Sequence, residues 1–148
     1  VLVIDIDDHV DDINRYVNLP NNCWVDYTAS GGCHIYLNKD DDIYEYSTTI
    51  GLKLWGFEHV DILIKNGFAY AGGTTYRHPV TNGTMSYVWD NEHNPLTVEK
   101  LGNIPTDWKE EILQNLEKVN RVGCIVSIEI FMNRNELPQI PDNNINPM

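Results

Sequence analysis

Two acidic side chains follow a strongly apolar segment at the start of the chain. Asp5 and Asp7 come directly after this segment, residues 1–4, with one residue between them. Because alternate side chains of an extended strand lie on one face, this spacing places both carboxylates together, close enough to hold divalent cations. Acids that merely solvate the end of a strand show the same pattern. For these two residues alone, a metal site and a solvated turn are equally good interpretations.

A third acid interrupts a later apolar segment. Asp61 lies within residues 60–64, whose other members are all strand-forming and apolar. A carboxylate there is costly to desolvate unless a cation or a donor compensates it, or unless the strand end faces solvent. Together with Asp5 and Asp7 it would complete an oxygen-rich site suited to Mg²⁺ or Mn²⁺.

A glycine pair with polar neighbours is a candidate phosphate-binding turn. Ser30, Gly31, Gly32 and His34 combine two residues without Cβ with a hydroxyl and an imidazole. Backbone N–H groups in such a turn can approach an anion while the two side chains add donors. An ordinary Gly-Gly hairpin followed by a surface histidine explains the same residues and is the commoner case.

The elements that position these residues are predicted to be mainly strands. Residues 1–6 are β-branched and apolar and predict a strand, and the apolar spacing at residues 10–17 predicts a short helix after it. Residues 23–28 and 32–37 predict a hairpin around the glycine pair. The expected arrangement is an antiparallel sheet that brings distant segments side by side.

Two Asn-Gly dipeptides predict further hairpins. The first, Asn66-Gly67, lies between strands expected at 60–64 and 68–71, and the second, Asn82-Gly83, precedes a strand expected at 86–89. Residues 43–55 show no clear period and give no prediction.

Helical spacing is clearest in the last third of the chain. Four apolar residues recur at intervals of four, four and three: Trp108, Ile112, Leu116 and Val119. They predict one buried face of a helix that begins near Thr106. A strand is expected at 124–132, and the Pro- and Asn-rich residues 138–148 are expected to be a linker or a disordered tail. We therefore expect one domain over 1–137.

Composition limits the class of protein. The chain has 148 residues with 42% hydrophobic side chains, enough for one globular core, and no apolar run approaches the roughly 20 residues of a membrane span. Its net charge of −12 disfavours a broad basic face for duplex DNA. Cys23, Cys33 and Cys124 form no CxxC pair and predict reduced thiols in an intracellular protein. Because the chain starts without Met inside an expected strand, we expect an upstream segment to be missing.

Three segments, taken in order, resemble the signature motifs of the archaeo-eukaryotic primase superfamily. They are VLVIDID at 1–7, SGGCHIYL at 30–37 and VDI at 60–62. The likeness is greatest to the bifunctional primase-polymerase (Prim-Pol) branch of plasmids, phages and large DNA viruses. Residues 67–71 and 83–89 are similar to later elements of that family, and Ile104-Pro105 before the expected helix also fits it, so the resemblance spans residues 1 to about 120.

The resemblance implies an α+β fold, the primase-polymerase catalytic core, with a mainly antiparallel sheet and flanking helices. It implies a DNA primase/polymerase that transfers nucleotides to a 3′-hydroxyl in the replication of a virus, phage or plasmid. Its partners would be nucleoside triphosphates, a single-stranded DNA template, a primer and a helicase domain or partner, and no membrane. Asp5, Asp7 and Asp61 would be the catalytic residues and hold two Mg²⁺ or Mn²⁺ ions.

The same resemblance assigns the incoming nucleotide's phosphates to the glycine turn. The residues concerned are Ser30, Gly31, Gly32 and His34. Residues 72–76 depart from the family, which has a proline pair and a serine there. Leu63 stands where a basic residue is usual, so Lys65 or Arg77 would have to supply that contact.

Two alternatives remain at this stage. One is a catalytically silent, primase-like module that binds nucleic acid in replication, although the acidic composition gives it little support. The other is a phosphohydrolase, since an apolar strand ending in DxD resembles the opening of haloacid dehalogenases. That family has Thr or Val where His9 stands here, which places the phosphohydrolase last.

Overall fold

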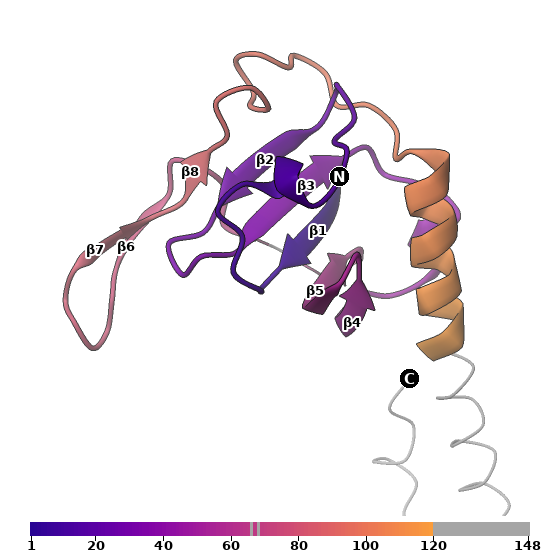
Figure 1. Ribbon diagram of the computed structural model, residues 1–148, viewed down its shortest axis with the longest axis horizontal. Coiled ribbons are helices and arrows are strands. Elements are labelled where there is room, and N and C mark those ends of the chain that lie inside the picture. Colours follow the sequence, from indigo (N-terminus) through magenta and orange to yellow (C-terminus); the bar gives the residue numbers. More distant parts are fainter. Residues whose placement is uncertain (66, 68, 120–148) are drawn as a thin grey trace, which may run out of the picture.

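The structure, a computed structural model, describes residues 1–65, 67 and 69–119, which form a mainly antiparallel sheet with a helix beside it (Figure 1). The strands of the main sheet follow the order β4-β5-β1-β3-β2-β8. Their bounds are β1 (Leu2–Ile6), β2 (Trp24–Tyr27), β3 (Cys33–Leu37), β4 (Thr49–Leu54), β5 (Phe57–Leu63) and β8 (Val88–Trp89). A separate two-stranded sheet joins β6 (Thr75–Arg77) to β7 (Thr84–Ser86). The expected α+β class with a mainly antiparallel sheet is confirmed.

Strand β1 lies near the centre of the main sheet and is buried on both faces. It pairs antiparallel with β3 on one side and β5 on the other. Leu2, Ile4 and Ile6 are fully buried in the main core. Val3 points to the opposite face, into a smaller apolar cluster. Asp5 lies on that second face, because side chains alternate along a strand.

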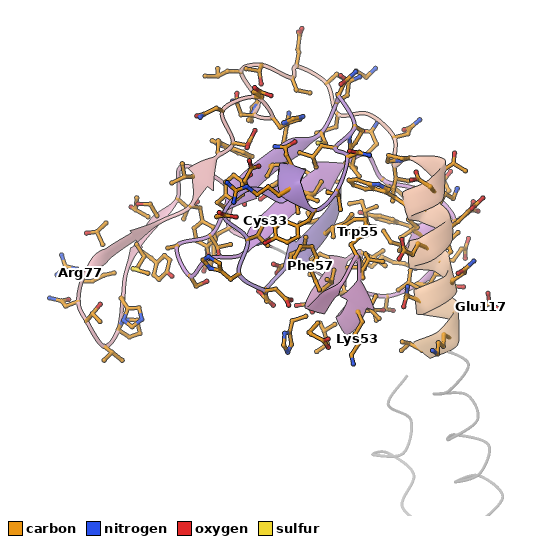
Figure 2. All side chains as sticks on the ribbon, viewed as in Figure 1. Cys33, Lys53, Trp55, Phe57, Arg77 and Glu117 are labelled. Carbon is orange, nitrogen blue, oxygen red and sulfur yellow. The ribbon has the colours of Figure 1, made fainter. Side chains whose placement is uncertain are left out.

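The helix at 106–119 covers the main core. Trp108, Ile112 and Leu116 are buried in the same cluster as the central strands, as their spacing predicts. Trp108 packs against Trp55, with 4.7 Å between ring centroids, on the side of the sheet that faces the helix (Figure 2). Val119 is 47% exposed, so its expected place on the buried face is wrong. None of the helices among the described residues has the length and apolar composition that crossing a membrane requires.

One expectation for the connecting segments was wrong. The helix expected at 10–17 is a single 3₁₀ turn, η1 (Ile13–Arg15), whose Asp12 side chain accepts a hydrogen bond from the Asn14 N–H. Val10 and Val17 are nevertheless buried, because the irregular segment still covers the core. Residues 43–55, for which the sequence gives no prediction, form η2 (Ile43–Glu45), β4 and the first residue of the β4–β5 turn.

The turn of the β4–β5 hairpin carries no Asn-Gly dipeptide. Trp55 and Gly56 both adopt positive φ there, at 54° and 84°. A tryptophan in this conformation is uncommon, and its packing against the helix helps to hold it. This is why turn chemistry did not reveal the hairpin.

The glycine dipeptides had mixed outcomes. The β2–β3 hairpin and the β6–β7 hairpin around Asn82-Gly83 are confirmed. The strand expected at 86–89 is divided between β7 and β8, which belong to different sheets. Residues 69–71 form no strand, while 66 and 68 lie outside the described residues. The expected strand at 124–132, the tail at 138–148 and the end of the domain at 137 also lie outside them.

Candidate active site

One row of polar side chains crosses the four central strands. The register pairs Asp61 of β5 with Asp5 of β1, Asp5 with His34 of β3, and His34 with Asp26 of β2. Residues directly opposite one another in neighbouring strands share a face. These four residues, which we call the polar row, therefore project from the face opposite to the main core.

Asp7 joins two members of the polar row just beyond the end of β1. One carboxylate oxygen of each of Asp5, Asp7 and Asp61 lies within 4.8 Å of the other two. The alternation of β1 brings Asp5 and Asp7 to one side, and the β1–β5 register adds Asp61. The structure thus brings together the three carboxylates that the sequence singles out as metal ligands.

The electrostatics of these carboxylates suit a divalent cation. Burial and the nearby charges of Asp5 and Asp61 raise the pKa of Asp7 above its ordinary value. The Oδ1 atom of Asp5 is buried, and the His34 Nε2 atom lies 3.4 Å from it. Three hard oxygen donors at this separation match the ligand preference of Mg²⁺ or Mn²⁺, so the residues present fit such an ion.

A bulge in the edge strand positions Asp61. The N–H of Gly51 donates to Asp61 Oδ1 at 2.9 Å. Gly51 has a φ of 73°, and the β4–β5 register shifts between Thr49 and Leu52. The bulge turns this N–H toward the carboxylate, and it supplies the donor that an acid in an apolar strand requires.

Asp8 holds the end of β1 in place. Its side chain accepts hydrogen bonds from the N–H groups of Glu58 and His59, at 3.0 and 2.8 Å. These bonds lower the pKa of Asp8, that from Glu58 most strongly. The Asp7 N–H also donates to the His59 carbonyl at 2.9 Å. Asp8 therefore ties the strand end to β5 and orients the neighbouring Asp7, a role that sequence reasoning missed.

His34 lies between two carboxylates and is only 4% exposed. Its Nδ1 atom is 2.7 Å from Asp26 Oδ1, and its Nε2 atom is 3.4 Å from Asp5 Oδ1. Burial opposes the charged imidazole, but Asp26 and Asp5 outweigh it and raise the pKa of His34 to about 9. The interpretation of His34 as an ordinary surface histidine is therefore wrong, since this side chain is a buried cation.

Asp26 is a fully buried acid that the sequence analysis did not single out. Besides the ion pair with His34, its Oδ2 atom accepts hydrogen bonds from the Tyr36 hydroxyl at 2.6 Å and the Gly72 N–H at 2.9 Å. It links β2, β3 and the segment after β5. A lone acid in an apolar strand, the signal that revealed Asp61, was present here too.

The glycine turn packs against the end of β1. A Cβ atom on Gly32 would lie 2.3 Å from the Ile6 carbonyl oxygen, so only glycine fits there. The Gly31 N–H donates to the Thr28 carbonyl at 3.1 Å, and the Gly32 N–H donates to the Thr28 hydroxyl at 2.9 Å. Ser30 contacts the same hydroxyl at 3.1 Å. Both N–H groups are thus used within the turn, and phosphate binding by these residues stays a prediction.

We expect Gly32→Ala to lower the free energy of unfolding by roughly 1–3 kcal/mol, because the new methyl group must push two backbone segments apart. Urea denaturation followed by circular dichroism measures the change. Gly83→Ala is the matched control, since its new methyl group would meet nothing closer than Thr81 Oγ1 at 3.6 Å. Equal stability of the two variants would contradict the close packing of the turn.

Neither basic residue expected near the third carboxylate forms an ion pair with it. Lys65 follows β5 and is exposed, and its backbone pairs with Ser47. Arg77 is at the end of β6, where it donates to Asn82 Oδ1 at 3.4 Å. Figure 2 places Arg77 on the projecting hairpin, away from Cys33 in the sheet. Among the described residues, His34 is the cation that lies in the polar row.

Of the expected reduced cysteines, Cys23 and Cys33 are free thiols buried in the main core, and Cys124 lies outside the described residues. Burial raises the pKa of Cys23 to about 12, so this thiol is not an activated nucleophile. The carboxylates and His34 are therefore the groups from which a reaction must be argued.

Comparisons of this chain with protein-family models, curated proteins and solved structures gave no match. The function is therefore inferred from the polar row, Asp7 and the three sequence motifs.

Proposed function

We propose that this protein is a DNA primase/polymerase, which transfers nucleotides to a 3′-hydroxyl under the direction of a single-stranded template. The observation that carries the proposal is the convergence of Asp5, Asp7 and Asp61, within 4.8 Å of one another, beside the buried cation His34. These four residues come from the three segments that resemble the Prim-Pol motifs. Nucleoside triphosphates, template and primer are then its partners in the replication of a virus, phage or plasmid, where a helicase domain or partner would act with it.

The carboxylates would hold Mg²⁺ or Mn²⁺. When bound, such ions lower the pKa of the attacking hydroxyl and neutralise the charge that develops on the leaving pyrophosphate. Asp61 is held by the Gly51 N–H and Asp7 by the bonds around Asp8, so the carboxylates are positioned before substrate arrives. No nucleophilic side chain is needed, because the substrate hydroxyl attacks.

His34 contributes a fixed positive charge beside the carboxylates. Asp26 holds its Nδ1 atom, which directs Nε2 toward Asp5. A cation at this position offsets part of the negative charge of the carboxylates and favours the approach of a triphosphate. Three carboxylates this close together repel one another unless a metal ion binds between them, so their presence favours an active enzyme over a silent module.

Primer extension tests the proposal. The purified chain is incubated with a fluorescent primer on a single-stranded DNA template, and the products are resolved on a gel. We expect extension that requires template, nucleotide and either Mg²⁺ or Mn²⁺. Template binding without extension would assign the silent module instead, and release of phosphate from a small phosphoester without extension would assign a phosphohydrolase.

We expect His34→Gln to raise the KM for nucleotide roughly tenfold or more, since the positive charge beside the expected triphosphate site is lost. The value of kcat should change less, because the three carboxylates remain. Steady-state extension at varied nucleotide concentration separates the two parameters. An unchanged KM would remove His34 from phosphate binding.

A further inference from the structure

Three tyrosines gather around a pocket beside the polar row. Tyr70, Tyr76 and Tyr87, together with two threonines, line a cavity of about 520 Å³. The Tyr87 ring centroid lies 5.9 Å from that of Tyr70 and 6.0 Å from that of Tyr76. Tyr70 is 58% exposed and Tyr76 is 39% exposed, so neither ring belongs to a core. Aromatic side chains left exposed around a concave site are typical of a binding surface.

The pocket is joined directly to the candidate active site. The Tyr87 ring stacks on the His34 imidazole, with 5.9 Å between centroids and 15° between planes. His34 in turn contacts Asp5, so the His34 ring lies between Tyr87, which lines the pocket, and the carboxylate of Asp5. Both backbone polar groups of Tyr87 are hydrogen-bonded. Its carbonyl accepts a hydrogen bond from the Gly73 N–H, and its N–H donates to the Thr74 carbonyl. The stacking surface is therefore built into the fold.

The charge of this region differs from that of the rest of the chain. All 22 acidic residues lie outside residues 62–89, the segment that contains the pocket and the β6–β7 hairpin. The same segment carries Lys65, Arg77 and His78. In a chain with a net charge of −12, the acid-free β6–β7 hairpin, which projects from the main sheet (Figure 1), is where the backbone of a polyanion meets less repulsion than beside the polar row.

We propose that the tyrosine pocket stacks an unpaired base of single-stranded DNA and that the β6–β7 hairpin carries the adjoining backbone. Exposed aromatic rings stack on any base, and nearby cations follow the phosphates. The hairpin projects from the main sheet (Figure 1), which provides a surface longer than one nucleotide and favours a strand over a free nucleotide. The inference rests on the proposed function only in naming this strand as the template.

The test measures binding without catalysis. Fluorescence anisotropy follows a labelled oligo(dT) with the purified chain at low salt, in EDTA and without nucleotide. We expect Tyr76→Ala to weaken binding roughly tenfold, because one stacking ring is lost. Tyr76→Phe should bind as the wild type does, since it keeps the ring. Tyr16→Ala is the matched control, because Tyr16 is 49% exposed but lies outside the acid-free segment.

A second measurement tests the hairpin. We expect Arg77→Ala to reduce the slope of log K against log salt concentration by about 0.7, the loss of one phosphate contact on a single strand. Unchanged oligo(dT) affinity in Tyr76→Ala would overturn the proposal that the pocket stacks a base. A Tyr76→Ala variant that changes only the KM for nucleotide, and not the oligo(dT) affinity, would overturn it as well. Binding that depends on Tyr76 in a chain that extends no primer would support the pocket while refuting the polymerase.

Discussion

Replacing Asp7 with asparagine is expected to reduce metal-dependent nucleotide incorporation by at least about a hundredfold, because a preorganised charge at the reacting centre is lost. Asp7 lies just beyond the end of β1, and its main-chain bond to His59 does not depend on the carboxylate. The variant should therefore fold. Primer extension at saturating nucleotide and Mn²⁺ measures the loss, with Asp41→Asn as an exposed acidic control.

Thermal stability gives a second readout of the same variant. Burial and like charges raise the pKa of Asp7 in the folded state, so its ionised form opposes folding at neutral pH when no metal is bound. Metal-free Asp7→Asn should thus be at least as stable as the wild type. Added Mn²⁺ should raise the Tm of the wild type and leave that of the variant nearly unchanged. Undiminished incorporation by the double variant Asp5→Ala, Asp7→Ala would refute the carboxylate site altogether.

We expect Asp26→Ala to lower the free energy of unfolding by about 3–5 kcal/mol, because it leaves a buried cation and two hydrogen-bond donors without their acceptor. The groups affected are His34, the Tyr36 hydroxyl and the Gly72 N–H. Asp26→Asn keeps an acceptor oxygen and should cost less. Urea denaturation compares both variants with Asp41→Ala, whose acid is exposed. Equal stability of Asp26→Ala and the control would show that the ion pair is not a structural element.

The pH dependence of stability reports on the same ion pair. The pKa of His34 is about 9 in the folded protein and 6.5 ordinarily, so the folded state binds the proton more tightly. The resulting stabilisation is complete below pH 6.5 and is lost as the pH rises through about 9. In metal-free protein, the wild type should lose stability across this interval more steeply than Asp26→Asn. Parallel curves would contradict a charged His34.

Local pattern was sufficient for much of the fold. Runs of β-branched, apolar and aromatic residues identified β1 and β3, and glycine chemistry identified the β2–β3 and β6–β7 hairpins. The pattern failed where packing overrides local preference. Trp55 takes a positive φ at the β4–β5 turn, and the residues around Ile13 form a single 3₁₀ turn in place of a helix.

The residues of the candidate site likewise fall into those that a local pattern could place and those that only the tertiary structure could place. Asp5 and Asp7 could be paired from their spacing, since alternation in a strand is a local property. Asp26 could not be placed, because a single acid in a strand does not reveal which buried cation it will meet. The stacking of Tyr87 on His34 likewise joins residues far apart in the chain.

Residue types and their spacing were therefore enough to establish a mainly antiparallel α+β domain with paired carboxylates and a glycine turn. Strand order and register, which are set by packing across the whole sheet, aligned Asp61, Asp5, His34 and Asp26 in one row. A shift of one residue in any of these pairings would turn that strand's polar side chain toward the main core. Long-range pairing, which no local sequence pattern specifies, is what turned separate acidic motifs into one charged site.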